Sequence, residues 1–380
     1  MNVLVTGGAG FIGSWLVGSL IADHHSVTVV DALTPQVHGA VPHLDAPWLT
    51  DRTVNFIRGD VRDRCLVDAA LDRVEAVVHL AAETGTGQSM YQIAHYYDVN
   101  LQATAQLFET IAERHRHIRR VVLASSRAVY GEGAYRQNGS TVVAQPRDAA
   151  RMRRGEFEPV GTNGEALELV PTPEDVTPQP ASIYAATKLA METLGGVFSG
   201  AYGIPVTALR FQNVYGERQS LRNPYTGILS IFANRMRQNL PINIFEDGQE
   251  SRDFVHVSDV VRAVVLALNS SLPGFHAVNV GSGVSTSVLD VAKILREVLG
   301  SLSELEITGD YRAGDIRHCY ADLRHARSVL GFEPAVSISD GLSRFCHWVT
   351  TQPVLADRSS QAMNELARLG LGSAAPGDVS

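Results

Sequence analysis

The sequence predicts an α/β fold, a doubly wound parallel sheet with helices on both faces. Two observations predict it: strand-like and helix-like segments alternate through the first half of the chain, and their spacing suits right-handed crossovers. The expected strands are Val3–Thr6, Val27–Val30, Val54–Arg58, Ala76–Leu80, Arg120–Ala124 and Pro205–Arg210. The expected helices between them are Gly13–Ala22, Leu66–Asp72, Asn100–Arg114 and Tyr184–Ala201. Parallel strands of this kind bring their carboxyl ends to one crevice, where ligands bind.

The first thirteen residues indicate which ligand that is. An apolar strand, Val3–Val5, is followed by glycines at every third position and then by a helix-like segment. This arrangement directs backbone N–H groups and a helix N-terminus at a pyrophosphate, and the glycines permit the close approach that it requires. Glycines are common in loops, so three of them alone would mean little. The pattern is informative because a strand precedes the glycines and a helix follows them. We expect a Rossmann-type dinucleotide site that includes Gly7, Gly10, Phe11, Ile12 and Gly13.

An acidic residue, Asp31, ends the second expected strand. A carboxylate at this point would accept hydrogen bonds from the adenosine ribose hydroxyls and would repel a 2′-phosphate. We therefore predict that the cofactor is NAD and not NADP.

Composition restricts the class of protein. The 380 residues are 45% hydrophobic and 19% charged, as in a globular protein of two lobes, and the net charge is −8. The charges form no basic stripe, so a nucleic-acid partner is not expected. The three cysteines are scattered, no apolar run is long enough to cross a bilayer, and a strand follows Met1 directly. We expect a cytoplasmic enzyme without a signal peptide or a membrane partner.

Tyr184 and Lys188 are the candidate catalytic pair. Residues four apart share one face of a helix, so the phenol and the ammonium can lie side by side. A phenol with a pKa of about 10 is a poor base at neutral pH, but an ammonium and an oxidised nicotinamide both favour the phenolate. Lys188 could also hold the nicotinamide ribose. Chance often places such a pair on a surface helix, and the dinucleotide site upstream is what favours the catalytic interpretation.

Two serines end the fifth expected strand, at the ligand edge of the sheet, in the run Leu123-Ala124-Ser125-Ser126. Ser126 is the first candidate for a hydroxyl that bonds the substrate oxygen from which Tyr184 removes a proton, and Ser125 is the second. The alternative is a turn or a helix cap, since serine favours both.

Three regions fall outside the regular alternation. The segment 131–181 is rich in Arg, Gly, Pro and Glu and too long for an ordinary connection, so we expect a lid, a binding loop or partial disorder. This segment would form part of the dinucleotide-binding domain, which we expect to span residues 1–212. Short elements in 213–350 predict a smaller, discontinuous substrate lobe, with some parts, notably Val278–Val280, returning to the sheet. The tail, 351–380, is expected to be partly mobile.

Together these motifs resemble the extended short-chain dehydrogenase/reductase family, in particular its NAD-dependent nucleotide-sugar epimerase and dehydratase branch. The resemblance runs from residue 1 to about 350, apart from the segment 131–181. Further motifs that carry it are Gly59-Asp60, His79-Leu80-Ala81-Ala82, Arg210-Phe211-Gln212-Asn213-Val214-Tyr215-Gly216 and Arg252-Asp253-Phe254-Val255-His256.

The resemblance also implies roles for residues at the matching positions. The cofactor would contact Asp60, Val61, Leu80, Ala81, Ala82, Asn100, Tyr184 and Lys188. A nucleotide-diphosphate sugar would contact Glu83, Thr84, Gly85, Ser126, Arg127, Asn213, Gln249, Arg252 and Arg317. Arginine suits this substrate because its planar fork matches phosphate oxygens.

Two positions choose among the reactions of this branch. In its 4,6-dehydratases an Asp-Glu pair follows the catalytic hydroxyl residue, whereas Arg127 and Ala128 stand there in this sequence. Neither can act as a general acid or base as a carboxyl group does, so elimination of water is disfavoured. The resemblance then implies a 4-epimerase that inverts C4 of a nucleotide-linked hexose through a transient 4-keto sugar. A 4-ketoreductase that consumes NADH or NADPH would use the same residues and stays open.

Finer features suggest the substrate and the assembly. The stretch Ala81–Met90 and the run that begins at Ser126 look most like bacterial 4-epimerases of dTDP-6-deoxyhexoses, of the dTDP-L-rhamnose 4-epimerase type. The helices Asn100–Arg114 and Tyr184–Ala201 carry small and apolar residues suited to the four-helix interface of a homodimer. The histidines lack carboxylates at ligand spacing, so no metal site is expected.

Overall fold

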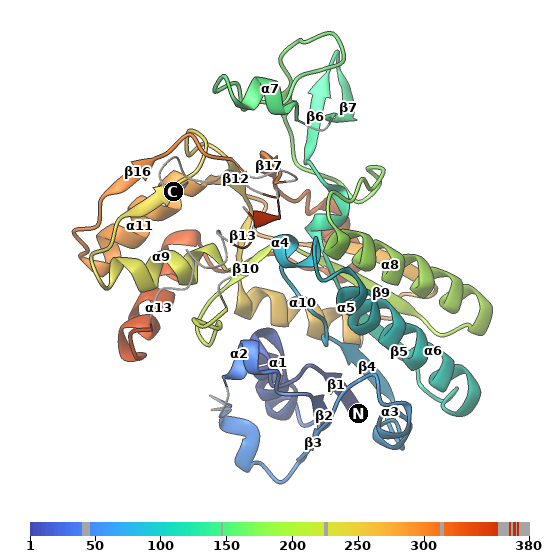
Figure 1. The fold of residues 1–380 in the computed structure, drawn as a ribbon. Coiled ribbons are helices and arrows are strands. Elements are labelled where there is room, and N and C mark those ends of the chain that lie inside the picture. Colours follow the sequence, from blue (N-terminus) through green and yellow to red (C-terminus); the bar gives the residue numbers. More distant parts are fainter. Residues whose placement is uncertain are drawn as a thin grey trace.

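Seven parallel strands form the central sheet, in the order β14–β9–β5–β4–β1–β2–β3 (Figure 1). They are β1 (Asn2–Thr6), β2 (Ser26–Asp31), β3 (Val54–Arg58), β4 (Ala76–His79), β5 (Arg120–Ser126), β9 (Val206–Phe211) and β14 (Phe275–Val280). The computed structural model describes residues 1–39, 46–145, 147–223, 227–311 and 315–355, together with residues 365, 368, 369 and 371. All six expected strands are present, and Val278–Val280 returns to the sheet by pairing with β9. The predicted doubly wound α/β fold is confirmed.

Helices cover both faces of this sheet, which explains why its strands are continuous apolar runs. In β1, Val3 and Val5 pack into the hydrophobic core on one face, and Leu4 packs into the core on the other. The first face is covered by α1 (Phe11–Ala22), α10 (Val257–Asn269) and α12 (Arg324–Leu330). The second face is covered by α3 (Arg64–Ala70), α6 (Ala103–Arg114) and α8 (Ile183–Tyr202). The strand order reverses between β1 and β4, and a crevice opens at the carboxyl ends of the strands there.

The expected helix Asn100–Arg114 begins earlier than the sequence indicated. A short helix α5 (Ile93–Tyr96), a π-helical turn η2 (Tyr97–Gln102) and α6 follow one another without a break. Helical turns of this wide type are rare and often occur at functional sites. Asn100 lies in the wide turn with its side chain fully buried.

The smaller lobe has its own hydrophobic core between three helices, α9 (Ile228–Met236), α11 (Val288–Leu299) and α13 (Ile338–Thr351). Its short strands are β10 (Asn213–Tyr215), β11 (Ile242–Ile244), β12 (Ser251–Arg252), β13 (Phe254–His256), β15 (Thr286–Ser287), β16 (Leu305–Ile307) and β17 (His318–Cys319). Helices α10 and α12, although they come from the same half of the sequence, pack on the main sheet. The predicted partial mobility of the tail, 351–380, falls mainly on residues outside the described ones.

The segment 131–181, described except for residue 146, projects at the top of Figure 1. It contains an antiparallel sheet of β6 (Ala134–Gln137), β7 (Ser140–Val143) and β8 (Glu168–Leu169). A short helix, α7 (Ala149–Met152), lies between β7 and β8 in the chain. Two ion pairs join it to the smaller lobe. Arg147 and Glu246 form a buried pair at 2.6 Å, and the exposed Glu158 carboxylate contacts buried Arg317 at 2.6 Å. Of the described residues of this segment, Ala181 alone lines the main cavity. The segment is therefore placed as a brace beside the crevice and not as a lid over it.

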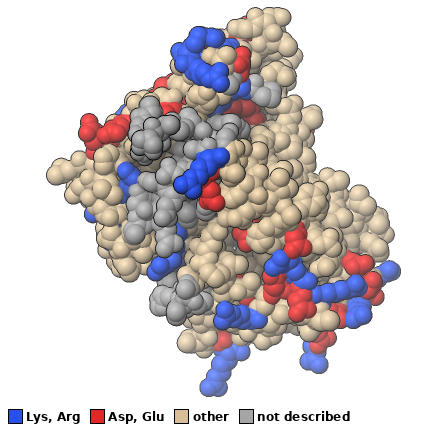
Figure 2. Space-filling view, in the orientation of Figure 1, with Lys and Arg blue, Asp and Glu red and all other residues tan. Residues whose placement is uncertain are grey.

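Charges of both signs are interspersed on the face drawn in Figure 2. Around α3 and α6 they form exposed ion pairs, such as Arg62 with Asp98 and Arg64 with Glu113, both at 2.6 Å. Within the described parts of the chain, no helix is both long and apolar enough to cross a membrane.

Candidate active site

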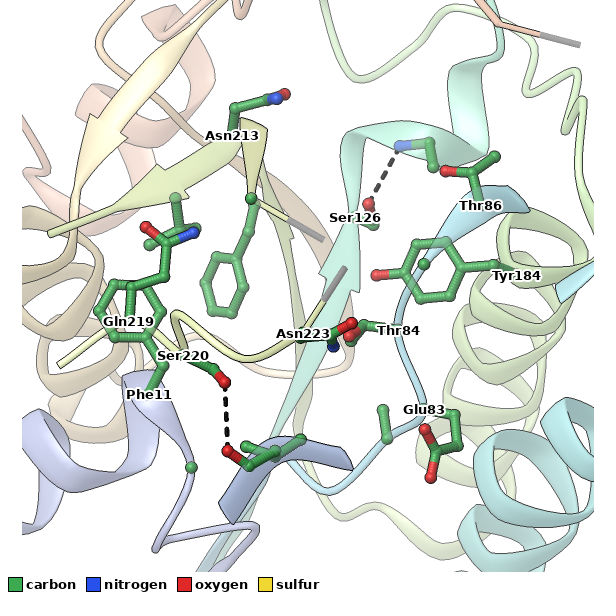
Figure 3. Close-up of a pocket in the computed structure, with 18 of the residues that line it drawn as sticks. Phe11, Glu83, Thr84, Thr86, Ser126, Tyr184, Asn213, Gln219, Ser220 and Asn223 are labelled. Atoms are coloured by element: carbon green, nitrogen blue, oxygen red, sulfur yellow. Dashed lines mark hydrogen bonds between the residues drawn. The ribbon is translucent and has the colours of Figure 1, made fainter. Parts of the chain in front are cut away.

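A cavity of about 1330 Å³ lies at the carboxyl ends of β1, β2, β4 and β5, between the main sheet and the smaller lobe (Figure 3). It is lined by the glycine turn, by the ends of these strands, by the start of α8 and by β10, β12 and β13. This is the crevice in which open α/β sheets bind their ligands.

The glycine turn at one end of the cavity is shaped for a phosphate-binding backbone. Gly7 has φ +70°, and a Cβ there would lie 2.7 Å from the backbone nitrogen of Ala81. A Cβ on Gly13 would overlap the carbonyl oxygen of Gly7. Helix α1 begins immediately after Gly10, which places its free N–H groups at the cavity. The turn therefore fits the pyrophosphate of a dinucleotide.

Asp31 stands at the end of β2 on the same cavity. Its carboxylate accepts hydrogen bonds from the backbone N–H of Ala9, at 3.0 Å, and of Leu33, at 2.8 Å. These two bonds hold the carboxylate against the glycine turn, where an adenosine ribose would be expected to lie.

All but one of the other predicted cofactor residues line the cavity. Those that line it are Gly10, Phe11, Ile12, Asp60, Val61, Leu80, Ala81, Ala82, Tyr184 and Lys188. Asn100 does not line it. Its side chain is bonded to both backbone groups of Glu83 and to the Thr187 hydroxyl, so it fixes the loop after β4 against α8.

Tyr184 projects from the first turn of α8 toward Ser126 (Figure 3). The helix begins there because the Ser182 hydroxyl caps it by accepting the Ala185 N–H at 3.1 Å. The backbone N–H of Tyr184 donates to the Ser89 hydroxyl at 3.0 Å, which fixes the ring further. Burial raises the pKa of the Tyr184 phenol, and a hydrogen bond with Ser126 acts in the opposite direction.

Lys188 lies one turn behind Tyr184 with its side chain buried. Its Nζ is 5.9 Å from the centre of the Tyr184 ring and donates to the Ala124 carbonyl at 2.8 Å. Burial lowers the pKa of Lys188 to about 8. A phenol, a hydroxyl and an ammonium thus meet at the end of β5, an arrangement that can remove a proton from a substrate hydroxyl.

Ser126 and Arg127 complete this end of the cavity. The Ser126 hydroxyl also accepts the Ala128 N–H at 3.1 Å, so the turn-capping alternative and the position at the cavity occur together. Arg127 lines the cavity, and its side chain makes no hydrogen bond or ion pair with any other residue that the structure describes. Ser125 donates instead to Glu192, on α8.

The substrate side of the cavity contains several of the predicted contacts. Those that line it are Glu83, Thr84, Gly85, Arg127, Asn213 and Arg252. The Arg252 guanidinium is anchored by the carbonyls of Ser251 and Ile316, at 2.8 and 2.7 Å, and by Asp315 at 3.2 Å. It is therefore held as a fixed positive group on the wall.

Two predicted substrate residues lie away from the cavity. Arg317 is fully buried and its guanidinium is bonded to three carboxylates, those of Glu158, Glu246 and Asp247. Gln249 is exposed, and the cavity is lined instead by the next residue, Glu250, which is 8% exposed. Burial raises the pKa of Glu250 to about 7.

Certain other residues line the cavity although the sequence indicated this only weakly or not at all. Glu250 and Arg252 are two apart on an extended segment and so share a face, which is a signal that the sequence offered. Gln219, Ser220 and Asn223 come from the loop after β10, which crosses the crevice in Figure 3. The Ser220 hydroxyl donates to the Val37 carbonyl at 3.1 Å, a contact between distant segments that no local pattern reveals.

A glycine turn, an acidic residue after β2 and a Ser–Tyr–Lys group around one crevice define a dinucleotide-dependent enzyme of the short-chain dehydrogenase/reductase class. The chain belongs to the NAD dependent epimerase/dehydratase family, whose sequence pattern matches residues 3–151 and 159–281. The predicted family, the NAD cofactor and the enzyme class are confirmed by this membership.

Individual relatives are similar along nearly the whole chain. A dTDP-L-rhamnose 4-epimerase of Burkholderia thailandensis is 36% identical over 354 residues, 92% of this chain and 95% of the relative. The crystal structure of a UDP-glucose 4-epimerase with UDP-glucose from Thermotoga maritima has a TM-score of 0.75 and 30% identity, covering 92% of this chain and 99% of that one. A Thermus thermophilus UDP-glucose 4-epimerase in complex with NAD has a TM-score of 0.72 and 28% identity, covering 93% and 100%.

Proposed function

We propose that this protein is an NAD-dependent nucleotide-sugar 4-epimerase, which inverts C4 of a nucleotide-linked hexose through a transient 4-keto sugar. The observation that carries the proposal is that Tyr184, Ser126 and Lys188 meet on a cavity continuous with the glycine turn. The 4-epimerases among the relatives support the reaction type.

The side chains at the cavity account for the proton transfer. Ser126 holds the oxygen on C4, and Tyr184, as phenolate, accepts its proton while Lys188 stabilises the negative charge of the phenolate. Bound NAD supplies the hydride acceptor and, after the sugar has turned, the hydride donor. Tyr184 then returns its proton to the oxygen of the 4-keto sugar. The cofactor is unchanged at the end of the cycle, so the protein has to retain it.

The residues after Ser126 favour this reaction over dehydration. Arg127 and Ala128 present no carboxyl group to the cavity, so neither can protonate a leaving hydroxyl as an Asp or Glu would.

We propose a dTDP-6-deoxyhexose as the sugar substrate. The support is the sequence around Ser126 and the 36% identity to the dTDP-L-rhamnose 4-epimerase. Anchored Arg252 and Asn213 would hold the diphosphate and nucleoside, with Glu83, Thr84 and Gly85 near the sugar.

The purified protein is expected to interconvert two C4 epimers of a dTDP-6-deoxyhexose without added NAD or NADH. The reason is that each cycle regenerates the cofactor. The measurement is proton NMR of a panel of nucleotide sugars, together with mass spectrometry of the small molecules released on denaturation. A reaction that consumes one NADH or NADPH per sugar would contradict the proposal and identify a 4-ketoreductase.

We also propose a homodimer formed through α6 and α8, which lie side by side at the right of Figure 1. The outer face of α8 exposes Val197 to 67% and Tyr202 to 46%, and the neighbouring α5 exposes Ile93 to 49%. Exposed apolar side chains on neighbouring helices are typical of a protein interface. A cytoplasmic location stays a prediction from composition.

Substituting Val197→Arg is expected to convert the dimer to a monomer, because it places a charge within an apolar interface. Light scattering measures the change, from twice the chain mass to the chain mass. The matched control is Val298→Arg, at a valine that is 42% exposed on α11, which should leave the mass unchanged. A monomeric unsubstituted protein would remove the claim.

A further inference from the structure

A buried carboxylate, Glu192, lies behind Lys188 on the side away from the cavity. Tyr184, Lys188 and Glu192 follow one another at four-residue intervals and so share one face of α8. Lys188 and Glu192 are 2% and 4% exposed. Tyr184 and Lys188 line the cavity, whereas Glu192 does not, so Glu192 can act on the site only through its neighbours.

Donors from two strands of the sheet fix the Glu192 carboxylate. The Ser125 hydroxyl, on β5, donates to its Oε1. The Arg210 guanidinium, on β9, donates to both oxygens, at 3.0 Å to Oε1 and 2.7 Å to Oε2. Arg210 donates in turn to the Tyr130 hydroxyl at 2.9 Å and to the Glu174 carbonyl at 3.0 Å. These bonds compensate the cost of burying a negative charge and keep it in one place.

The other groups that face Lys188 do little to keep its ammonium charged. Its Nζ donates to a neutral carbonyl, that of Ala124, at 2.8 Å. His79, on β4, is fully buried, and burial lowers its pKa to about 3, so it is uncharged near neutral pH. Burial lowers the pKa of Lys188 to about 8, and the negative charge of Glu192 acts in the opposite direction.

We propose that Glu192 is a positioning residue that keeps Lys188 protonated at the pH of turnover and thereby sustains the phenolate of Tyr184, while Ser125 and Arg210 hold Glu192 in place. The link to turnover rests on the proposed function, but the charge of Lys188 can be measured without turnover. Ser125, the second candidate for the substrate oxygen, also lines the cavity, but its hydroxyl donates to Glu192 and so has a supporting role in this arrangement.

The composition of the chain makes this charge observable. Its two lysines are Lys188 and Lys293, and Lys293 is exposed on α11. Protein labelled with ¹³C at lysine Cε therefore gives two lysine signals, each of which reports the protonation of its own amine.

In the unsubstituted protein we expect the buried lysine to titrate near pH 8. In Glu192→Gln it should titrate at least about one pH unit lower, because the nearby negative charge is gone. The Lys293 signal should be the same in both proteins. The alkaline limb of the kcat profile should move down with the Lys188 titration, while the NAD content and the KM for the nucleotide sugar are retained.

Two further variants separate this effect from a loss of stability. Glu192→Gln leaves Arg210 buried without its partner, so the double variant Glu192→Gln/Arg210→Met, which removes both charges, keeps the fold testable. It should shift the Lys188 titration downward as well, but by less than Glu192→Gln, because removal of the Arg210 cation acts in the opposite direction. The matched control is Asp259→Asn, at a carboxylate on α10 that is 3% exposed, is paired with Arg262 at 3.1 Å and does not line the cavity. It should lower Tm without moving the titration or the pH profile.

Unchanged Lys188 titration and an unchanged alkaline limb in both Glu192 variants would overturn the inference and leave the ion pair with Arg210 as purely structural. A shifted Lys188 titration in a protein that epimerises no sugar would instead support the inference and refute the proposed function.

Discussion

Substituting Tyr184→Phe is expected to lower kcat by about a thousandfold, because we propose the phenol as the group that takes the proton from the C4 hydroxyl. The ring, its packing on α8 and the bond from its backbone N–H to Ser89 all remain. Binding of the nucleotide sugar and retention of NAD should therefore be preserved. Proton NMR of the epimerisation measures the first effect, and calorimetry with the unreactive variant measures the second.

The matched control is Tyr202→Phe, which makes the same change at an exposed tyrosine on the same helix. It should leave kcat unchanged. Turnover in Tyr184→Phe equal to that of the control would show that another group is the base, and the account of the Ser–Tyr–Lys group would fail.

The second large effect concerns the glycine turn. Substituting Gly13→Ala is expected to abolish NAD retention and to lower the free energy of unfolding by about 1–3 kcal/mol. The new Cβ would overlap the Gly7 carbonyl and lie 2.6 Å from the Gly8 Cα, so the backbone that faces the pyrophosphate has to move. NAD released on denaturation and thermal unfolding measure the two effects.

Gly18→Ala is the control within the same helix. A Cβ at Gly18 meets no atom within 4 Å, so this change should keep NAD bound and stabilise the protein by about 0.5–1 kcal/mol. Full NAD content in Gly13→Ala would contradict the assignment of the turn as the pyrophosphate site.

Local sequence patterns were sufficient for the fold and for one wall of the cavity. The apolar runs in β1 and β5 reflect burial on both faces, and the residues that follow such strands are forced to the ligand edge. For this reason Asp31 and Ser126 could be placed on the cavity from the sequence. The four-residue spacing of Tyr184 and Lys188 on α8 is equally local.

Residues whose position depends on distant segments could not be placed in this way. Arg317 is held among carboxylates that include Glu158, which the projecting segment brings across from another part of the chain. Asn100 lies in a π-helical turn that directs its side chain to the loop of Glu83 and not to the cavity. The position of Glu250 could have been predicted from the sequence, since Glu250 and Arg252 alternate on an extended segment and so share a face.

The anchoring of the segment 131–181 limits how far the crevice can open. Its two ends leave the main sheet next to Ser126 and Tyr184, while Arg147 and Glu158 bind it to the smaller lobe. Rotation of that lobe away from the sheet would have to stretch this connection or break both ion pairs, of which Arg147–Glu246 is buried. The segment is thus a tether between the sheet and the smaller lobe, and under the proposed mechanism it would keep the 4-keto sugar in the crevice until it is reduced.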